Sequence, residues 1–310
     1  MFDLGDRVLR KVREAQFNRA ARAVLTTPPV RARDDGVVLF SMVGTRVLLP
    51  YLVAAKSFHA RLGRGRIAIL DDGTLTAEDR AVLAFHLDGP EIHSIDAVDA
   101  GDCPRGGCWE RLLTLLDLRQ SDYVIQLDSD TVTLGPVPEI VQAIEAGCDF
   151  ALLGGPTTCW LPVGEFVASL GPDWGDTHIQ GAIEWKLAQA CGQVPGLTHY
   201  LRGCAGFAGF AAGGMGRETA DGFSRAAAAL LGAERWAQWG SEQVMSNLIV
   251  ANEGEPLLLP YARYLNFWNE QFGDDAALVH FVGTYRFHRG AYFQAARQAI
   301  AALSSERLAA

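Results

Sequence analysis

The sequence predicts an α/β fold in which a mostly parallel central sheet is flanked by helices. From Gly36 onward, short apolar runs alternate with runs of helical length. Hydrophobic residues make up 49% of the chain and charged residues 20%, as in ordinary globular proteins. At 310 residues the chain is long enough to bury a full core. Strands that alternate with helices favour parallel pairing, because the helices then cover both faces of the sheet.

The expected elements follow one another without a long linker. Buried strands are predicted at residues 37–43, 66–70, 91–95 and 122–127, and helices at residues 48–62, 76–86 and 108–120. Thr76, followed three residues later by Asp79, indicates a helix start, since these two side chains can close a capping box.

Residues 1–35 form a separate N-terminal segment, predicted as a helix and linker. The segment holds eight Arg and Lys residues against five Asp and Glu, a net charge of +3, so the rest of the chain carries −12. Leu4, Val8, Val12 and Ala15 share one helical face, with arginines around them. Such a helix either rests on an anionic membrane surface or packs on its own domain, and we favour packing.

Composition and charge exclude several classes of protein. A net charge of −9 is unfavourable for general nucleic-acid binding, which needs a basic footprint. No run approaches the roughly 18 apolar residues of a membrane span, and the N-terminus lacks the layout of a signal peptide. The six cysteines complete no zinc motif. We therefore expect a cytoplasmic chain without a nucleic-acid partner.

The segment YVIQLDSDTVTLGP, residues 123–136, carries the clearest chemical signal. Its apolar run ends in two carboxylates one residue apart, Asp128 and Asp130. Two carboxylates this close repel each other and resist joint ionisation. In open α/β sheets, ligands bind beyond the carboxyl ends of the strands, where this pair is expected to lie. The position predicts a functional site.

Two chemistries fit such a pair. In the first, the carboxylates hold a divalent cation that binds the diphosphate of a sugar nucleotide. In the second, Asp128 attacks a phosphoryl group, as in haloacid-dehalogenase-like phosphatases. Both LDSDTVT (127–133) and ILDDGTLT (69–76) resemble the signature of those phosphatases. Against it, several strand–helix units precede Asp128, and the acidic pair in FGDDAALVH (272–280) lacks the later acid that such enzymes use.

An ordered series of motifs resembles the glycosyltransferases of the A fold, closest to family 8, which includes glycogenin-like and galactosyltransferase-like enzymes. Besides the acidic pair, the series consists of VVLFSMVGT, IAILDDGTLTAEDRAVL, WERLLTLLDL, LRGCAGFAGFAAG, WGSEQVMSNLIVAN and LVHFVGTYRFHRG. The resemblance covers residues 36–290 and implies a single Rossmann-like domain. It implies a nucleotide-sugar half at residues 36–135 and an acceptor half at residues 136–290, followed by a C-terminal helix at residues 291–310.

The resemblance also implies a set of site residues. Asp128, Asp130 and His280 are expected to bind Mn²⁺ or Mg²⁺, with His288 as a rival to His280. Arg111 and Glu242 are expected to be catalytic. The nucleotide-sugar donor, expected to be linked to uridine diphosphate, is assigned to Ser41, Thr45, Arg111, Asp128, Ser129, Gly283 and Arg286. Here Arg286 takes the place of a lysine that is usual in the family.

The acceptor side is less defined by the sequence. Glu242 is either the base that deprotonates an acceptor hydroxyl, giving inversion, or a group that orients the acceptor in a retaining reaction. The acceptor is expected to be a glycan, a glycolipid or a small hydroxyl compound, as in bacterial surface glycan synthesis. Four aromatic residues either stack on sugars or pack in the core: Trp236, Trp239, Phe267 and Trp268. A degenerate site that binds the donor without turnover is a further alternative.

Overall fold

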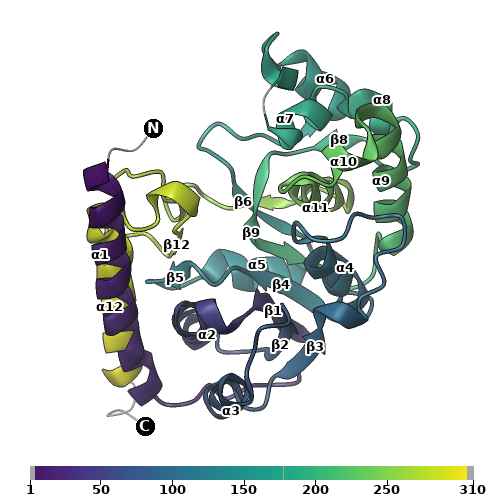
Figure 1. The fold of residues 1–310 in the computed structure, drawn as a ribbon. Helices are drawn as coiled ribbons and strands as arrows, with labels where there is room; N and C mark the ends of the chain where they lie inside the picture. Colours follow the sequence, from purple (N-terminus) through teal and green to yellow (C-terminus); the bar gives the residue numbers. More distant parts are fainter. Residues whose placement is uncertain (1–3, 177, 306–310) are drawn as a thin grey trace. The chain divides into compact units, whose positions relative to one another are not determined.

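The computed structural model describes residues 4–176 and 178–305, and Figure 1 labels its elements. The chain divides into two compact units. The first unit consists of the described residues of Met1–Ser94, Leu127–Val141 and Pro260–Ala310, and the second of Ile95–Gln126 and Gln142–Leu259. Within the described ranges, no helix has both the length and the apolar character needed to cross a membrane.

A parallel sheet forms the core of the first unit. Its strands are β1 (Val37–Val43), β2 (Arg66–Asp71) and β3 (Glu91–Ser94), in the order β1-β2-β3. The connections contain η2 (Thr45–Val47), α2 (Leu48–Leu62) and α3 (Ala77–His86). β1 and β2 are buried along nearly their whole length, as expected for parallel strands between helices. The sequence predicted β1 and α2 with these bounds.

The predicted capping box begins α3. The Oγ1 of Thr76 accepts from the backbone N–H of Asp79 at 3.1 Å, and the carboxylate of Asp79 accepts from the backbone N–H of Thr76 at 2.9 Å. Two backbone donors of the first turn are satisfied in this way.

A second sheet of three short strands in the same unit was not predicted. It contains β11 (Tyr264–Asn266), β12 (Leu278–His280) and β5 (Thr131–Thr133), in the order β11-β12-β5. β11 runs parallel to β12, and β12 runs antiparallel to β5. The register places Asn266, His280 and Thr131 in one row across the sheet. The chain continues through η5 (Gly283–Tyr285) and η6 (His288–Gly290).

The N-terminal helix α1 (Leu4–Ala21) packs against the C-terminal helix α12 (Ala291–Ser305), as Figure 1 shows. It is followed by η1 (Arg22–Thr26). The ring of Phe17 stacks on the ring of Tyr292 with centroids 3.9 Å apart. Ala21 and Val24 are also buried.

The packed face of α1 therefore differs from the face that the sequence indicated. Val12 is 47% exposed and Ala15 is also exposed, while the side chains of Leu4 and Val8 lie outside the described part of the chain. Phe17, which the predicted face did not include, contributes a large buried ring that packs against Tyr292 of α12.

The second unit contains a mixed group of strands in the order β10-β6-β9-β4. β6 pairs antiparallel with β9 and parallel with β10. The strands are β4 (Tyr123–Leu127, whose last residue belongs to the first unit), β6 (Phe150–Leu153), β7 (Leu161–Pro162), β8 (His199–Tyr200), β9 (Gly203–Phe210) and β10 (Leu257–Leu258).

The described part of the second unit also contains helices. They are η3 (Ile95–Ala97), α4 (Trp109–Leu118), α5 (Pro138–Ala146, which begins in the first unit), α6 (Val163–Ala168), η4 (Trp174–Asp176), α7 (Ile179–Glu184), α8 (Leu187–Cys191), α9 (Arg217–Leu231), α10 (Ala233–Trp236) and α11 (Ser241–Asn252). The alternation of strands and helices confirms the predicted α/β class. The assignment of residues 36–135 and 136–290 to donor and acceptor remains a prediction.

Candidate functional site

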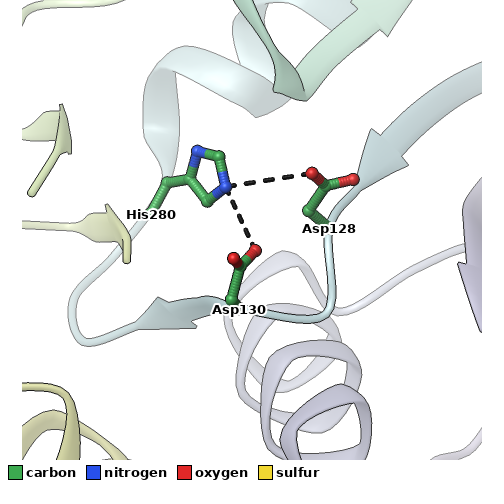
Figure 2. Close-up of side chains that lie close together, drawn as sticks. All are labelled: Asp128, Asp130 and His280. Carbon is green, nitrogen blue, oxygen red and sulfur yellow. Dashed lines mark hydrogen bonds and ion pairs between the residues drawn. The ribbon is translucent and has the colours of Figure 1, made fainter. Parts of the chain in front are cut away.

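Three predicted metal ligands converge in the first unit (Figure 2). Asp128 directly follows β4, Asp130 directly precedes β5, and His280 ends β12. The Nε2 atom of His280 lies 3.1 Å from Oδ1 of Asp130 and 3.8 Å from Oδ2 of Asp128. The candidate ligand atoms of all three residues lie within 4.8 Å of one another. Residues 150 positions apart in the chain are thus brought to one point.

Two of the three candidate ligands are buried. Asp130 and His280 are buried, and the side chain of Asp128 is 31% exposed. Burial raises the pKa of Asp130, but His280 and Arg286 beside it lower that pKa, and the net position is below the ordinary value. Asp130 is therefore ionised at neutral pH, as a metal ligand must be.

The donor set fits a divalent cation. Two carboxylates and one imidazole nitrogen converge, and hard cations take carboxylate oxygens as ligands. Atoms bound to one ion at about 2.1 Å lie about 3 Å apart when they are adjacent, which suits the distances to His280 Nε2. His288 does not belong to this cluster in the described part of the chain. Its ring instead packs edge-on against Tyr285, with centroids 5.2 Å apart.

The predicted residues Arg286 and Ser129 lie beside the cluster. Arg286 forms an ion pair with Oδ2 of Asp130, and its Nε donates to the carbonyl of Phe281 at 3.1 Å. The carbonyl of Ser129 accepts from the hydroxyl of Tyr292 at 3.4 Å. Gly283 begins η5, between His280 and Arg286. The guanidinium of Arg286 is thus paired with Asp130, the same carboxylate that is expected to bind the cation.

Ser41 and Thr45 have structural partners. The hydroxyl of buried Ser41 donates to the carbonyl of Leu127 at 2.6 Å, which fixes the chain just before Asp128. The hydroxyl of Thr45 donates to Oδ2 of Asp79 at 2.6 Å and holds the pKa of Asp79 below its ordinary value. Their assignment to donor binding stays a prediction.

The segment ILDDGTLT forms a closed turn after β2. Oδ1 of Asp71 accepts from the backbone N–H groups of Gly73 at 2.9 Å and Leu75 at 3.2 Å, and the other oxygen pairs with Arg80. Oδ1 of Asp72 accepts from the backbone N–H of Thr74 at 3.0 Å. These carboxylates maintain a turn, so the geometry gives no support to a phosphatase signature in this segment.

The other predicted pair, Arg111 and Glu242, lies within the second unit. Arg111 on α4 donates to Oε1 of Glu242 on α11 at 3.0 Å, and both side chains are buried. The first turns of the two helices are also joined by Trp109 Nε1, which donates to Ser241 Oγ at 2.8 Å. Gly240 directly precedes α11 and has a φ of 100°, and a Cβ at this position would lie 2.6 Å from the ring of His178. Two hydrogen bonds thus join the first turns of α4 and α11 beside each other.

Two polar residues of these sites were missed in the sequence. Asn266 is buried, and its Oδ1 lies 2.9 Å from Nδ1 of His280. Gln243 follows Glu242 and is half-buried, and its Oε1 accepts from the backbone N–H of Ala205 at 3.3 Å. A polar residue within the apolar run YLNFW was the only available signal for Asn266.

The four aromatic residues separate into two classes. Trp236 and Phe267 are each 1% exposed and belong to the core, so the interpretation that they stack on sugars is wrong. Trp239 is 71% exposed and Trp268 is 51% exposed. Trp239 packs edge-on against His178, with ring centroids 5.8 Å apart.

Comparison with known proteins identifies the fold. No protein-family model matches the sequence, and no curated protein matches it. Among solved structures, galactosyltransferase LgtC in complex with donor and acceptor sugar analogues is 14% identical, with a TM-score of 0.50 over 87% of this chain and 95% of that chain. GlyE of Streptococcus pneumoniae TIGR4, in its apo form, is 12% identical, with a TM-score of 0.52 over 89% of this chain.

The bifunctional glycosyltransferase WbbM, also in its apo form, is 14% identical, with a TM-score of 0.50 over 89% of this chain. The chain spans 53% of the length of WbbM and 64% of the length of GlyE. At these identities the likeness establishes the fold. The predicted glycosyltransferase A fold is confirmed.

Proposed function

We propose that this chain is a metal-dependent glycosyltransferase that moves a sugar from a nucleotide-diphosphate donor to a hydroxyl acceptor. The observation that carries the proposal is the convergence of Asp128, Asp130 and His280 on one point, on a glycosyltransferase A fold. Donor and acceptor sugar analogues are bound by LgtC, whose fold is similar. A carboxylate pair at a strand end supports the same class of chemistry.

We assign Mn²⁺ to the site in preference to Mg²⁺. Mg²⁺ is held in proteins chiefly by oxygen ligands, whereas a transition metal ion also accepts the imidazole nitrogen that His280 offers. When bound, the cation supplies Lewis acidity toward the diphosphate that leaves. Asp128 and Asp130 would hold the cation at the end of β4. Arg286 adds a hydrogen-bond donor beside Asp130.

Arg111 and Glu242 are proposed as the second functional pair. Because Oε1 of Glu242 already accepts from Arg111, we assign Glu242 to orienting the acceptor rather than to removing its proton. In a retaining reaction the leaving phosphate can take that proton, so no protein base is needed. Arg111 keeps the carboxylate in one position, as a preorganised site requires.

The proposed acceptor is a glycan or glycolipid. Trp239 is largely exposed and lies three residues before Glu242. An exposed indole offers a flat apolar face to a sugar ring while its N–H stays accessible to polar groups. A uridine diphosphate donor follows from the resemblance to family 8.

We also propose that α1 contacts an anionic membrane surface. Leu9 and Val12 are 45% and 47% exposed, and the exposed bases Arg10 and Lys11 lie between them. Basic residues around exposed apolar side chains are typical of helices that lie at a membrane interface.

The proposal is tested by melting curves of the purified chain with a panel of nucleotide sugars, each with and without Mn²⁺. A donor at 100 times its Kd stabilises the folded state by about 2.7 kcal/mol, and this should raise the melting temperature by roughly 5 °C. The stabilisation should depend on Mn²⁺, and the matching donor should slowly release nucleoside diphosphate. Donor binding without any release would instead identify a binding protein.

The phosphatase alternative makes a different prediction. It requires release of inorganic phosphate from sugar phosphates and capture of beryllium fluoride on Asp128. Either result, without Mn²⁺-dependent binding of a nucleotide sugar, would overturn the proposed function.

A further inference from the structure

Asn266 lies directly behind the candidate metal ligand His280. The two residues are paired in the parallel register of β11 and β12, so their side chains share one face of the sheet. Asn266 is 1% exposed, and its Oδ1 lies 2.9 Å from Nδ1 of His280. The other ring nitrogen of His280, Nε2, faces Asp130 and Asp128, as Figure 2 shows.

This hydrogen bond determines which ring nitrogen carries a proton. The amide oxygen of an asparagine can only accept, so Nδ1 of His280 must donate. Nε2, at 3.1 Å from Oδ1 of Asp130, donates to that carboxylate when the ring is protonated and carries the lone pair when the ring is neutral, which is the form that a metal binds. In the neutral form, three electron-rich atoms, Nε2 and one oxygen from each aspartate, face one another. A cation at their centre would bind all three.

Holding the strands together does not require the side chain of Asn266. The backbone N–H of Phe267 donates to the carbonyl of His280 at 2.8 Å, and the carbonyl of Asn266 accepts from the hydroxyl of Tyr261 at 3.4 Å. Asn266 itself is 1% exposed, so its amide lies away from water. Placing an amide in such surroundings is costly unless it is hydrogen-bonded, and here the bond is made to His280.

We propose that Asn266 is a positioning residue that fixes the tautomer and orientation of His280, so that Nε2 is the atom presented to a divalent cation. The inference rests on the proposed metal-dependent function. It assigns a role to a residue that would touch neither the cation nor the sugar donor. Partners of this kind orient a metal-binding histidine and typically account for 10–100-fold in metal affinity.

The test is a titration of the purified full chain with Mn²⁺ in the absence of a sugar donor. The electron paramagnetic resonance signal of free Mn²⁺ measures how much of the ion is bound and gives its Kd. Asn266→Leu removes the acceptor and should raise the Kd for Mn²⁺ by about 10–100-fold. Asn266→Asp keeps an acceptor at the same position and should bind Mn²⁺ at least as tightly as the wild type.

Asn247→Leu is the matched control. Asn247 is also buried, and its Nδ2 donates to the carbonyl of Gly203 at 3.2 Å within the second unit. Its loss should lower the melting temperature but leave the Kd for Mn²⁺ unchanged. Equal Mn²⁺ affinity of Asn266→Leu and the wild type would overturn the inference.

A second measurement separates positioning from a loss of folding. In the nitrogen-15 NMR spectrum of histidine-labelled protein without added metal, the Nδ1–H of His280 should exchange slowly with solvent, because this N–H is buried against Asn266. The signal is assigned by its absence in His280→Asn, and it should vanish in Asn266→Leu and persist in Asn266→Asp. If it persists in Asn266→Leu, the inference is wrong. If the wild-type protein fails to bind Mn²⁺, the proposed metal site itself is wrong. That result differs from a failure of the inference about Asn266, because it is seen without any variant.

Discussion

The guanidinium of Arg111 lies 3.0 Å from the carboxylate of Glu242, and both side chains are almost wholly buried. Removing one partner of a buried ion pair leaves the other charge uncompensated, at a cost of about 3–5 kcal/mol. Arg111→Met should lower the free energy of unfolding by that amount, whereas Arg111→Met combined with Glu242→Leu should recover most of it. Urea unfolding of the wild type, both single variants and the double variant measures the coupling. Additive losses would show that the two residues do not act as a pair.

The same ion pair leads to a kinetic prediction for Glu242. Glu242→Gln keeps the shape of the side chain and removes its charge. We expect the KM for the acceptor to rise, while slow hydrolysis of the donor changes little and the product keeps the donor's anomeric configuration. Proton NMR of the product's anomeric centre identifies the configuration. A product of inverted configuration, with a fall in kcat of roughly 10²–10⁴-fold, would instead assign Glu242 as the general base.

Removal of one metal ligand gives the third prediction. Asp130→Asn should lower Mn²⁺-dependent release of nucleoside diphosphate by at least about 10²-fold, because the carboxylate no longer holds the group that stabilises the leaving diphosphate. The melting temperature should also fall somewhat, since Asp130 is buried and paired with both Arg286 and His280.

Asp117→Asn is the control for this variant, because Asp117 forms an exposed ion pair with Arg217. Exposed pairs contribute less to stability than buried ones, so turnover should be unchanged and the melting temperature should fall less than in Asp130→Asn. Full turnover in purified Asp130→Asn would show that the metal assignment is wrong.

Much of the first unit could be predicted, because the sequence patterns that indicate its elements lie within single strands and helices. The apolar run of β1 and the Thr76–Asp79 capping box depend on residues within one element, and the structure has them where the sequence indicated. Asp128 and Asp130 could be singled out for the same reason, since a single strand end carries both.

Asn266 could not be predicted, because its role depends on a long-range pairing. β11 is only three residues long, and it pairs with β12 fourteen residues later, so neither strand has enough alternation to show a period. The orientation of α1 was missed for a related reason. The position of Tyr292 on α12 decides which face of α1 is buried, and helical periodicity within α1 contains no information about a partner at the other end of the chain.

The fourth prediction concerns Lys56, a buried amine of the first unit. Its Nζ lies 3.0 Å from Nδ1 of His86, and burial lowers its pKa from 10.5 to about 8. Between these two values the unfolded chain holds the proton more tightly than the folded chain, so the contribution of Lys56 to stability rises with pH. Below the lower value both states are protonated, and the full cost of the buried charge is present.

Lys56→Met removes this cost, because an apolar side chain of similar length replaces the amine. Its stability relative to the wild type, measured by urea unfolding, should be greatest near pH 7 and should shrink toward about pH 10. Lys11→Met, at an exposed position of α1, is the control. Its free energy of unfolding should differ from that of the wild type by the same small amount at pH 7 and at about pH 10. A difference between Lys56→Met and the wild type that does not vary with pH would show that Lys56 does not titrate in this window.

The last prediction concerns the exposed face of α1. Deleting residues 1–35 is a poor test of membrane contact, because the deletion also removes Phe17 from its stack on Tyr292. Arg10→Gln combined with Lys11→Gln changes only exposed charges. Each basic residue near an anionic surface contributes about 1 kcal/mol, so the double variant should bind vesicles of phosphatidylglycerol roughly 30-fold more weakly. Co-sedimentation with vesicles at low and high salt measures this.

Salt and lipid charge provide the controls for this test. Wild-type binding should fall steeply as salt rises, because screening acts on exposed charges, and vesicles of neutral phosphatidylcholine should bind weakly. Val12→Asp should weaken binding to the anionic vesicles as well, since Val12 is 47% exposed on the same helix. Phe17→Ala should instead lower the melting temperature, because Phe17 packs inside the first unit. If vesicle binding is the same for anionic and neutral lipid, and the same for the double variant and the wild type, a membrane role is contradicted. α1 is then only a packing element of the fold.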